Sequence, residues 1–245
     1  MIEPGWIAAR WPASPRIRAG ITTRAGGVSR PPYAELNLAD HVGDDPAAVR
    51  ENRARLRRYL ALPAEPLWLK QVHGVQVCTD VQQGTQADAS VSQQPGQVCA
   101  VMTADCLPVL LCDRAGTVVA AAHAGWRGLA ANVITETLKR MPVDPAEVMV
   151  WLGPAIGPRA FEVGDDVRTC FLGLGDDYAR VFVTQTPGKW LMDIYAAARL
   201  QLAGLGVSQV YGGEYCTFED DQRFYSYRRE RDTGRMASLI WIQPG

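Results

Sequence analysis

Apolar residues follow two different periods along the chain. From Leu67 to Ala124, short β-rich runs are separated by turns that contain Gly, Gln, Pro or Asp. This pattern predicts adjacent core strands, and the runs are VQVCTDV, QVCAVMT, LPVLLCD and TVVAAAH. Three later segments are also strand candidates, namely VMVWLGPAI, VSQVYGGEYCTF and ASLIWIQ.

Other segments have helical spacing. Asp45-Pro46 can begin a helix, because the carboxylate caps free backbone N–H groups and proline suits the first helical position, and this helix should run to about Leu60. The run GLAANVITETLKRM predicts one further helix, and two more are expected near residues 165–172 and 191–205. The whole, residues 1–245, is expected to form an α/β (α+β) single domain with a mixed β-sheet core flanked by helices.

The first predicted helix is unusually basic. Val49, Leu56 and Leu60 line one side of it, and arginines occupy much of the remainder, at positions 50, 53, 57 and 58. Such a run could meet phosphate groups, but ordinary amphipathic helices show the same pattern. The sequence alone therefore favours a solvated helix face.

Composition and charge narrow the classes of function. The chain has 25 basic and 26 acidic residues and a net charge of −1, so no overall field favours nucleic acid or an anionic membrane. The first residues lack the pattern of a secretory signal or transit peptide, and the longest apolar stretches are far shorter than the roughly 20 residues needed to span a bilayer. We expect a cytoplasmic protein, a monomer or small homo-oligomer, that binds small molecules.

Three short segments carry the candidate chemistry. They are KQVHG, TADCLP and HAGWRG, and they place His73, Cys106 and His123 at predicted strand ends beside glycine or proline. Two imidazoles and one thiolate form a three-ligand set suited to zinc, with a fourth position open for water or substrate. Only three histidines and six cysteines occur, and the cysteines have no Cys-x-x-Cys spacing.

Two other interpretations of these residues stay open. The histidines could be satisfied core or surface residues and Cys106 a small buried hydrophobe, because the three are scattered over about fifty residues of the chain. Alternatively, Cys106 could be a nucleophile with His73 or His123 as its base. Spacing does not decide between these possibilities.

The segments also resemble a known family. In this order they look like the signature of the laccase-domain or YfiH-like proteins, once called multicopper polyphenol oxidases and now associated with purine nucleoside phosphorylase activity. The resemblance extends over nearly the whole chain through ITTRAGGVS, LNLADHVGDD, QVHG, ADA, TADCLPVLL, AAHAGWRGL, LGPAIGP, FEVG, FYSYRR and TGR. It implies a layered sandwich of the YfiH-like type, with His73, Cys106 and His123 as metal-binding and catalytic residues.

The resemblance further implies a reaction and a metal. The reaction is phosphorolysis of adenosine, inosine and methylthioadenosine to free base and ribose 1-phosphate, with companion adenosine deaminase activity and zinc, or possibly copper, as the metal. Arginine suits phosphate because its planar fork binds oxyanions bidentately, and the candidates are Arg24 and Arg228 or Arg229.

Other residues near these motifs receive weaker assignments. His41 is expected to line the pocket, and Asp105 could serve as general acid or base or could orient a ligand histidine. Trp126, Phe224 and Tyr225 could stack on a purine.

Three other functions remain possible. A four-copper phenol oxidase needs about ten imidazole ligands, so three histidines allow at most one mononuclear copper. A peptidoglycan-editing hydrolase would use Cys106 as its nucleophile. A non-catalytic module with a structural metal would require adjacent ligand pairs, which the sequence lacks.

Overall fold

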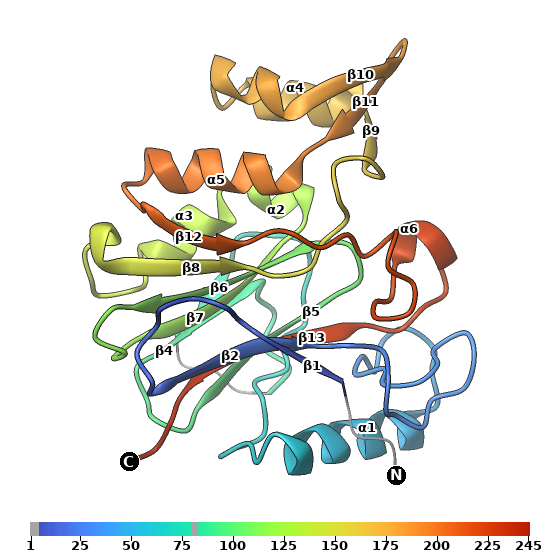
Figure 1. The fold of residues 1–245 in the computed structure, drawn as a ribbon, viewed down its shortest axis with the longest axis vertical. Coiled ribbons are helices and arrows are strands. Elements are labelled where there is room, and N and C mark those ends of the chain that lie inside the picture. Colours follow the sequence, from blue (N-terminus) through green and yellow to red (C-terminus); the bar gives the residue numbers. More distant parts are fainter. Residues whose placement is uncertain (1–4, 80–82) are drawn as a thin grey trace.

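The computed structural model describes residues 5–79 and 83–245 and shows a layered arrangement of sheets and helices (Figure 1). Its largest sheet has six strands, in the order β12 (Gln209–Gly212), β8 (Val148–Leu152), β6 (Leu107–Asp113), β7 (Val119–Ala124), β4 (Ala89–Ser92) and β3 (Val77–Cys78). The two outer pairs, β12 with β8 and β3 with β4, are parallel and the inner pairs are antiparallel. The predicted mixed α/β class is therefore confirmed.

The described residues form three sheets, and their layers agree with the sandwich that the resemblance implies. A four-stranded antiparallel sheet contains β1 (Trp6–Ala8), β2 (Ile17–Thr22), β13 (Met236–Ile242) and β5 (Val98–Thr103). The run QVCAVMT therefore pairs with β13 and not with its sequence neighbour β6. Of the run VQVCTDV only Val77–Cys78 is a strand, and its last two residues, 80 and 81, lie outside the described ranges.

The two larger sheets pack face to face. Val101 and Ile240 of the four-stranded sheet share one buried cluster with Leu110 and Trp151 of the six-stranded sheet. Alternate residues of the same strands point to the opposite faces, where helices cover them. Strands buried on both faces read as continuous apolar runs, so the runs alone could not assign a strand to one sheet or the other.

Helices form the outer layers. Helix α1 (Pro46–Tyr59) covers the four-stranded sheet, with Asp45 as its N-cap as predicted, and α4 (Asp165–Leu172) agrees with its predicted range. The outer face of the six-stranded sheet is covered by α2 (Trp126–Ala130), α3 (Val133–Leu138) and α5 (Ile194–Gly204). The remaining short helices are η1 (Pro145–Glu147), η2 (Asp176–Val181) and α6 (Tyr227–Glu230).

One predicted helix is broken. The run GLAANVITETLKRM contains two short helices because Asn132 has a left-handed backbone with φ +70°. Asparagine tolerates this conformation better than most residues. Its side-chain oxygen accepts a hydrogen bond from Gln201 at 2.8 Å, which fixes the break against α5.

A small third sheet lies with α4 beyond α5 (Figure 1). It contains β10 (Phe182–Thr186), β11 (Lys189–Met192) and β9 (Glu162–Gly164). The strand β10 was not predicted, since four of its five residues are exposed and its sequence lacks apolar alternation. Among the described residues, no helix has both the length and the apolar character needed to cross a bilayer.

Candidate functional site

Sheet pairing brings Cys106 and His123 together. Strands β6 and β7 pair so that Pro108 lies opposite His123, and Cys106 is the residue just before β6. His73 reaches the same place from the loop before β3, with its Nε2 3.8 Å from the Cys106 Sγ. The rings of His73 and His123 meet edge to face, with centroids 4.7 Å apart. Residues fifty positions apart thus converge at one point.

A single buried carboxylate, that of Asp88, fixes both histidines. Its Oδ1 lies 2.8 Å from His123 Nδ1, which leaves Nε2 of that ring free to face Cys106. The same carboxylate accepts the backbone N–H groups of Val72, His73 and Gly74 at 3.2, 2.9 and 2.7 Å. Burial would raise the pKa of Asp88, but these hydrogen bonds and the charge of His123 hold it below its usual range. Asp88 therefore positions one ligand by its ring and the other by its backbone.

The three donors fit a metal ion. The ligand atoms of His73, Cys106 and His123 all lie within 4.8 Å of one another. In tetrahedral zinc sites the bond lengths place nitrogen and sulfur donors roughly 3.5 Å apart, so small side-chain movements would close the set around an ion. The carboxylate behind His123 is the usual partner of a metal-ligating imidazole. The residues could therefore hold a metal with one coordination position left open.

Without a metal, Cys106 and His123 form an ion pair. Burial would raise the pKa of the Cys106 thiol, but the positive charge of His123 and hydrogen bonds from both histidines lower it to about 6. Burial would likewise lower the pKa of His123, yet the Cys106 thiolate and the Asp88 carboxylate raise it to about 9. At neutral pH the metal-free site thus holds a thiolate beside an imidazolium.

The backbone around His73, Cys106 and His123, called the trio below, is tightly constrained. A Cβ atom at Gly125 would lie 3.0 Å from the Cys106 Sγ and 3.1 Å from the His73 ring, so only glycine leaves room for the ligands there. His73 and Asp105 both have left-handed backbones, with φ of +60° and +94°. Such conformations cost free energy and persist only where the surroundings enforce them.

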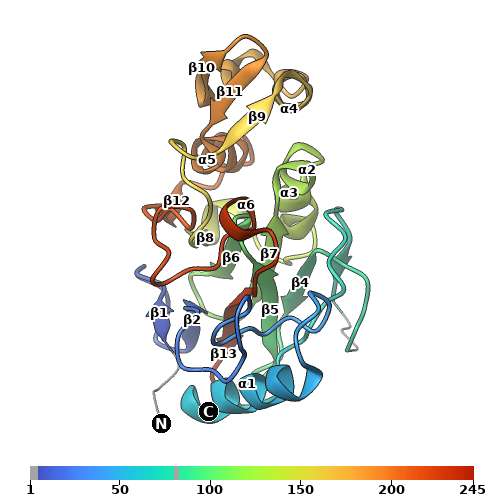
Figure 2. The ribbon, with the colours of Figure 1, turned by 90° about the vertical axis from the view of Figure 1, so that its right-hand side faces the viewer.

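The trio opens into a cavity with a volume of about 550 Å³. One part of its lining is apolar and comes from Trp126, Ile156, Phe161 and Ile194. The polar part includes His41, Gln71, Tyr227, Arg127, Arg228 and Arg235. Figure 2 looks onto α6, whose Arg228 backbone N–H donates to Asp105 at 2.6 Å beside the metal ligands. The cavity has the size of a small-molecule site.

Two of the four residues predicted to bind substrate lie in this cavity. Arg228 lines it, with its guanidinium over the Phe161 ring and one N–H donated to the Glu162 carbonyl at 2.8 Å. His41 lines it as well. Burial and the charge of Arg235 lower the His41 pKa.

The other two predicted residues, Arg24 and Arg229, are engaged outside the cavity lining. Arg24 donates to the carbonyls of Ala34 and Asp221 and pairs with Glu230 at 3.3 Å. Arg229 donates to three backbone carbonyls, those of residues 217, 218 and 224. These guanidinium groups hold loops together, and phosphate binding by Arg24 or Arg229 stays a prediction.

Asp105 does not orient a histidine. Its Oδ1 accepts the Thr217 hydroxyl at 2.7 Å and its Oδ2 accepts the Arg228 N–H. These two hydrogen bonds tie α6 to the site, and because Asp105 also lines the cavity, a role in proton transfer stays a prediction. The orienting role belongs to Asp88, which sequence reasoning missed although it lies in the motif ADA.

Sequence reasoning also missed Gln71 and Arg235. The Gln71 amide makes two hydrogen bonds with the Met102 backbone, at 2.8 and 2.7 Å, and so ties the His73 loop to the end of β5. Arg235 lines the cavity next to His41 and Arg228, and its position in the motif TGR was the only signal for it.

Of the three aromatic candidates, Trp126 alone lines the cavity. Phe224 and Tyr225 are fully buried in the cluster between the two larger sheets. They are core anchors.

Comparison with known proteins agrees with this architecture. The family described as multi-copper polyphenol oxidoreductase laccase matches residues 18–243. A Pseudomonas aeruginosa protein named as a purine nucleoside phosphorylase is 55% identical over 240 residues, which are 97% of this chain and 98% of that protein. The Escherichia coli purine nucleoside phosphorylase YfiH is 52% identical, over 96% of this chain and 98% of its own length.

Solved structures show the same fold. A Neisseria meningitidis protein aligns with a TM-score of 0.95 at 50% identity and covers 98% of this chain and 100% of its own. YlmD from Geobacillus stearothermophilus aligns with a TM-score of 0.93 at 31% identity and covers 98% and 97%. By sequence over nearly its full length and by structure, this chain belongs to the multi-copper polyphenol oxidoreductase laccase family, with the YfiH fold.

Proposed function

We propose that the chain is a zinc-dependent purine nucleoside phosphorylase acting on adenosine, inosine and methylthioadenosine, with companion adenosine deaminase activity. The observation that carries the proposal is the convergence of His73, Cys106 and His123 on one wall of a cavity of about 550 Å³. The names of relatives at 55% and 52% identity support the same reaction class.

The cavity offers separate places for a base and for phosphate. Trp126 and Phe161 provide apolar rings against which a purine can pack. Arg228 and Arg235 lie in the same lining, and the Arg235 Nη1 is held by the carbonyls of Thr233 and Gly234 at 2.7 and 3.0 Å. Held in this way, the guanidinium can present its remaining N–H groups to an oxyanion without further ordering.

In phosphorolysis the bond between the ribose and the purine nitrogen breaks, and a phosphate oxygen bonds to the ribose carbon. The arginines would hold phosphate on one side of the sugar, and close positioning of two reactants supplies much of such a rate enhancement. His41, whose pKa is lowered, would contact the substrate as a neutral hydrogen-bonding ring.

A metal ion held by the trio would contribute to the chemistry. Zinc held by His73, Cys106 and His123 would supply a Lewis acid and a bound water of lowered pKa, which adenosine deamination requires. Asp88 would keep the Nε2 of His123 directed at the ion, and Gly125 would keep the space beside Cys106 clear.

The test is a chromatographic assay of purified protein with adenosine or inosine, with and without phosphate, together with metal analysis. We expect base release only with phosphate, equal amounts of ribose 1-phosphate, slower conversion of adenosine to inosine, and about one zinc per chain. Base release without phosphate would overturn phosphorolysis, and copper in place of zinc would overturn the metal assignment.

A cysteine hydrolase that edits peptidoglycan precursors is the second candidate, and one observation favours it. Asp88, His123 and Cys106 are arranged like an acid, base and nucleophile, and the Cys106 pKa is lowered to about 6. Release of an amino acid from a muropeptide precursor by the metal-free protein, with no action on nucleosides, would select this candidate.

A further inference from the structure

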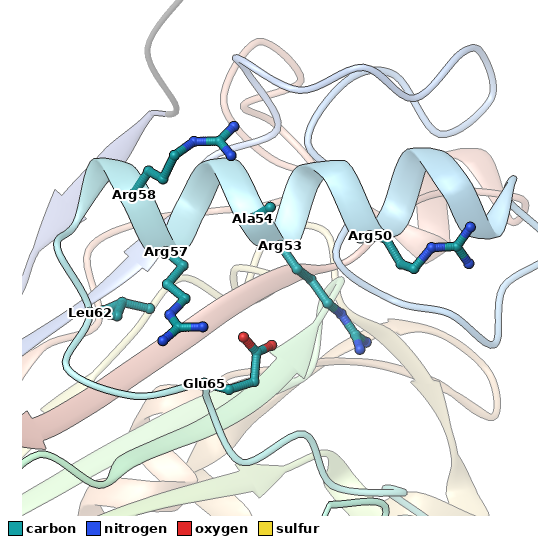
Figure 3. Close-up of a pocket in the computed structure, with 7 residues that line it drawn as sticks. All are labelled: Arg50, Arg53, Ala54, Arg57, Arg58, Leu62 and Glu65. Atoms are coloured by element: carbon teal, nitrogen blue, oxygen red, sulfur yellow. The ribbon is translucent and has the colours of Figure 1, made fainter.

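The arginine-rich side of α1 forms a second hollow in the molecule. The helix and the loop that follows it enclose a volume of about 590 Å³, drawn in Figure 3. Its lining contains Ala54, Leu62, Glu65 and the arginines at positions 50, 53, 57 and 58. None of these residues lines the cavity around Cys106. The hollow is therefore a separate site, independent of the proposed function.

We call this hollow along α1 the groove. Three of its four arginines are placed to bind a ligand. Figure 3 shows Arg53 and Arg57 pointing from the helix toward the loop that carries Glu65, whereas Arg58 points away on the other side. Arg58 also pairs with Glu51 at 3.3 Å. Arg50 lines the groove one turn before Arg53. The groove arginines are accordingly Arg50, Arg53 and Arg57.

Arg53 is held firmly in place at the inner side of the groove. Its Nε donates to the Leu38 carbonyl at 2.9 Å, and its guanidinium lies 4.4 Å over the Trp68 ring. Its Nη2 faces the Asp40 carboxylate at 3.5 Å but makes no hydrogen bond within the described chain. Because Nη2 is buried, Arg53 contributes a fixed positive charge to the inner wall of the groove.

The groove carries uncompensated positive charge. Within residues 5–79 and 83–245, neither Arg50 nor Arg57 forms a salt bridge. Glu65 is the one carboxylate in the lining, and its Oε1 accepts the Trp68 indole N–H at 2.7 Å. Even with Asp40 close to Arg53, the positive charge along the groove exceeds the negative charge, and a bound anion would reduce the repulsion among the guanidinium groups. The sequence suggested a solvated helix face, but a concave and partly pre-ordered face concentrates this charge.

We propose that this groove binds a small ligand that carries two or more linked phosphate groups. Arg50 and Arg57 are seven residues apart, so their backbones lie roughly 10 Å apart along the helix. Linked phosphates can contact more of this row of positive charge than a single phosphate can. A volume of about 590 Å³ suits a small molecule, and the net charge of −1 disfavours a long nucleic acid.

Calorimetric titration of the intact protein with inorganic tripolyphosphate tests the site. The double variant Arg50→Gln/Arg57→Gln should bind at least roughly tenfold more weakly, because it loses two charge-assisted sets of hydrogen bonds. Arg55→Gln is the matched control, because it removes a charge from the same helix at a residue outside the lining, and it should bind like the parent. Glu65→Gln should bind more tightly, since it removes the opposing carboxylate and keeps an acceptor for Trp68.

Three results would overturn the proposal. Equal weakening by Arg55→Gln would show diffuse attraction to a basic helix and not a groove. Unchanged affinity in the double variant, with its circular dichroism intact, would place tripolyphosphate elsewhere. Arginine-dependent binding of a single-stranded oligonucleotide or of anionic vesicles, without binding of tripolyphosphate, would make the groove a macromolecular contact.

Discussion

The cavity around Cys106 and the groove along α1 have similar volumes, about 550 and 590 Å³, but they are built in opposite ways. The groove comes from one helix and the loop after it, so its arginines lie within eight residues of one another. The cavity comes from turns at the ends of strands that are distant in sequence. Local periodicity places the arginines of the groove on one helix, whereas the residues of the cavity are brought together only by strand pairing.

The two regions also differ in how their charges are balanced. In the cavity the Cys106 thiolate, the His123 imidazolium and the Asp88 carboxylate offset one another over short distances. In the groove, Arg50 and Arg57 form no salt bridge with any residue that the structure describes. Opposite charges that pair within the cavity hold its reactive groups in fixed positions, as catalysis requires. Positive charges that lack a partner in the groove can instead attract an anion from solution.

The largest expected effect comes from removing the sulfur at the centre of the cavity. Cys106→Ala should lower kcat/KM for nucleoside phosphorolysis by at least about a thousandfold, because groups that act as a unit fail together. Cys170→Ala changes an exposed cysteine and should leave activity unchanged. A Cys106→Ala protein that retains activity would show that the trio is not the reactive centre, and the contrast with the groove would disappear.

The next effect tests the carboxylate behind the histidines. Asp88→Asn should weaken metal binding by about 10- to 100-fold, the usual result of losing a partner of a ligand histidine, as measured by competition with a chromogenic chelator. Asp113→Asn is the matched control, because Asp113 is a buried carboxylate at the far end of β6 that accepts the N–H groups of Thr117 and Val118. It should lower stability and leave metal affinity unchanged.

The ion pair in the metal-free cavity predicts a pH dependence. The Cys106 thiolate, the reactive form, accumulates as pH rises through about 6. With an ordinary thiol pKa of 8.5 the thiolate population at pH 7 would be about 30-fold smaller. After removal of metal with a chelator, iodoacetamide should label Cys106 with a midpoint near pH 6, as read by peptide mass spectrometry.

Cys112 provides the internal control for this labelling, since burial raises its pKa to about 12 and it should stay unlabelled. A Cys106 midpoint above pH 8 would mean that His123 does not carry the charge inferred for it.

A smaller effect is expected at the phosphate side of the cavity. Arg235→Gln should raise KM for phosphate about tenfold with a lesser change in kcat, the cost of one charge-assisted hydrogen-bonded contact. Arg159→Gln removes an exposed arginine outside the cavity, paired with Glu219, and should change neither constant. Equal KM values for both variants would leave Arg228 as the remaining arginine candidate.

Sequence patterns predicted the parts of this molecule that depend on local spacing. Helices α1 and α4 and most core strands follow from periodicity and capping, whereas the assignment of His73, Cys106 and His123 as ligands rested on the family resemblance and stays a prediction. The division into sheets was not predictable, because β5 and β6 are buried on both faces and look alike in sequence.

Two aspartates in the site also show that the sequence does not reveal contacts created by strand pairing. Asp105 adjoins Cys106 in the sequence and so attracted the orienting role, yet its side chain turns toward Thr217 and Arg228. Asp88 holds that role because β4 pairs with β7 and places it beside His123. No local signal in the sequence reports such a pairing, so proximity along the chain was a misleading guide.

The smallest effect compares strain in the two regions. Ala61, just after the end of α1, has φ +46°, while Asp105 in the cavity has φ +94°. Glycine usually occupies the position of Ala61, and a left-handed alanine costs about 1 kcal/mol, partly offset by the greater freedom of unfolded glycine. Ala61→Gly should therefore raise the free energy of unfolding by about 0.5 kcal/mol in urea titrations and leave activity unchanged. Asp105→Gly would relieve the same kind of strain but lose the bonds to Thr217 and Arg228, so activity should fall. If both variants kept full activity, the strain at Asp105 would have no more functional meaning than that at Ala61.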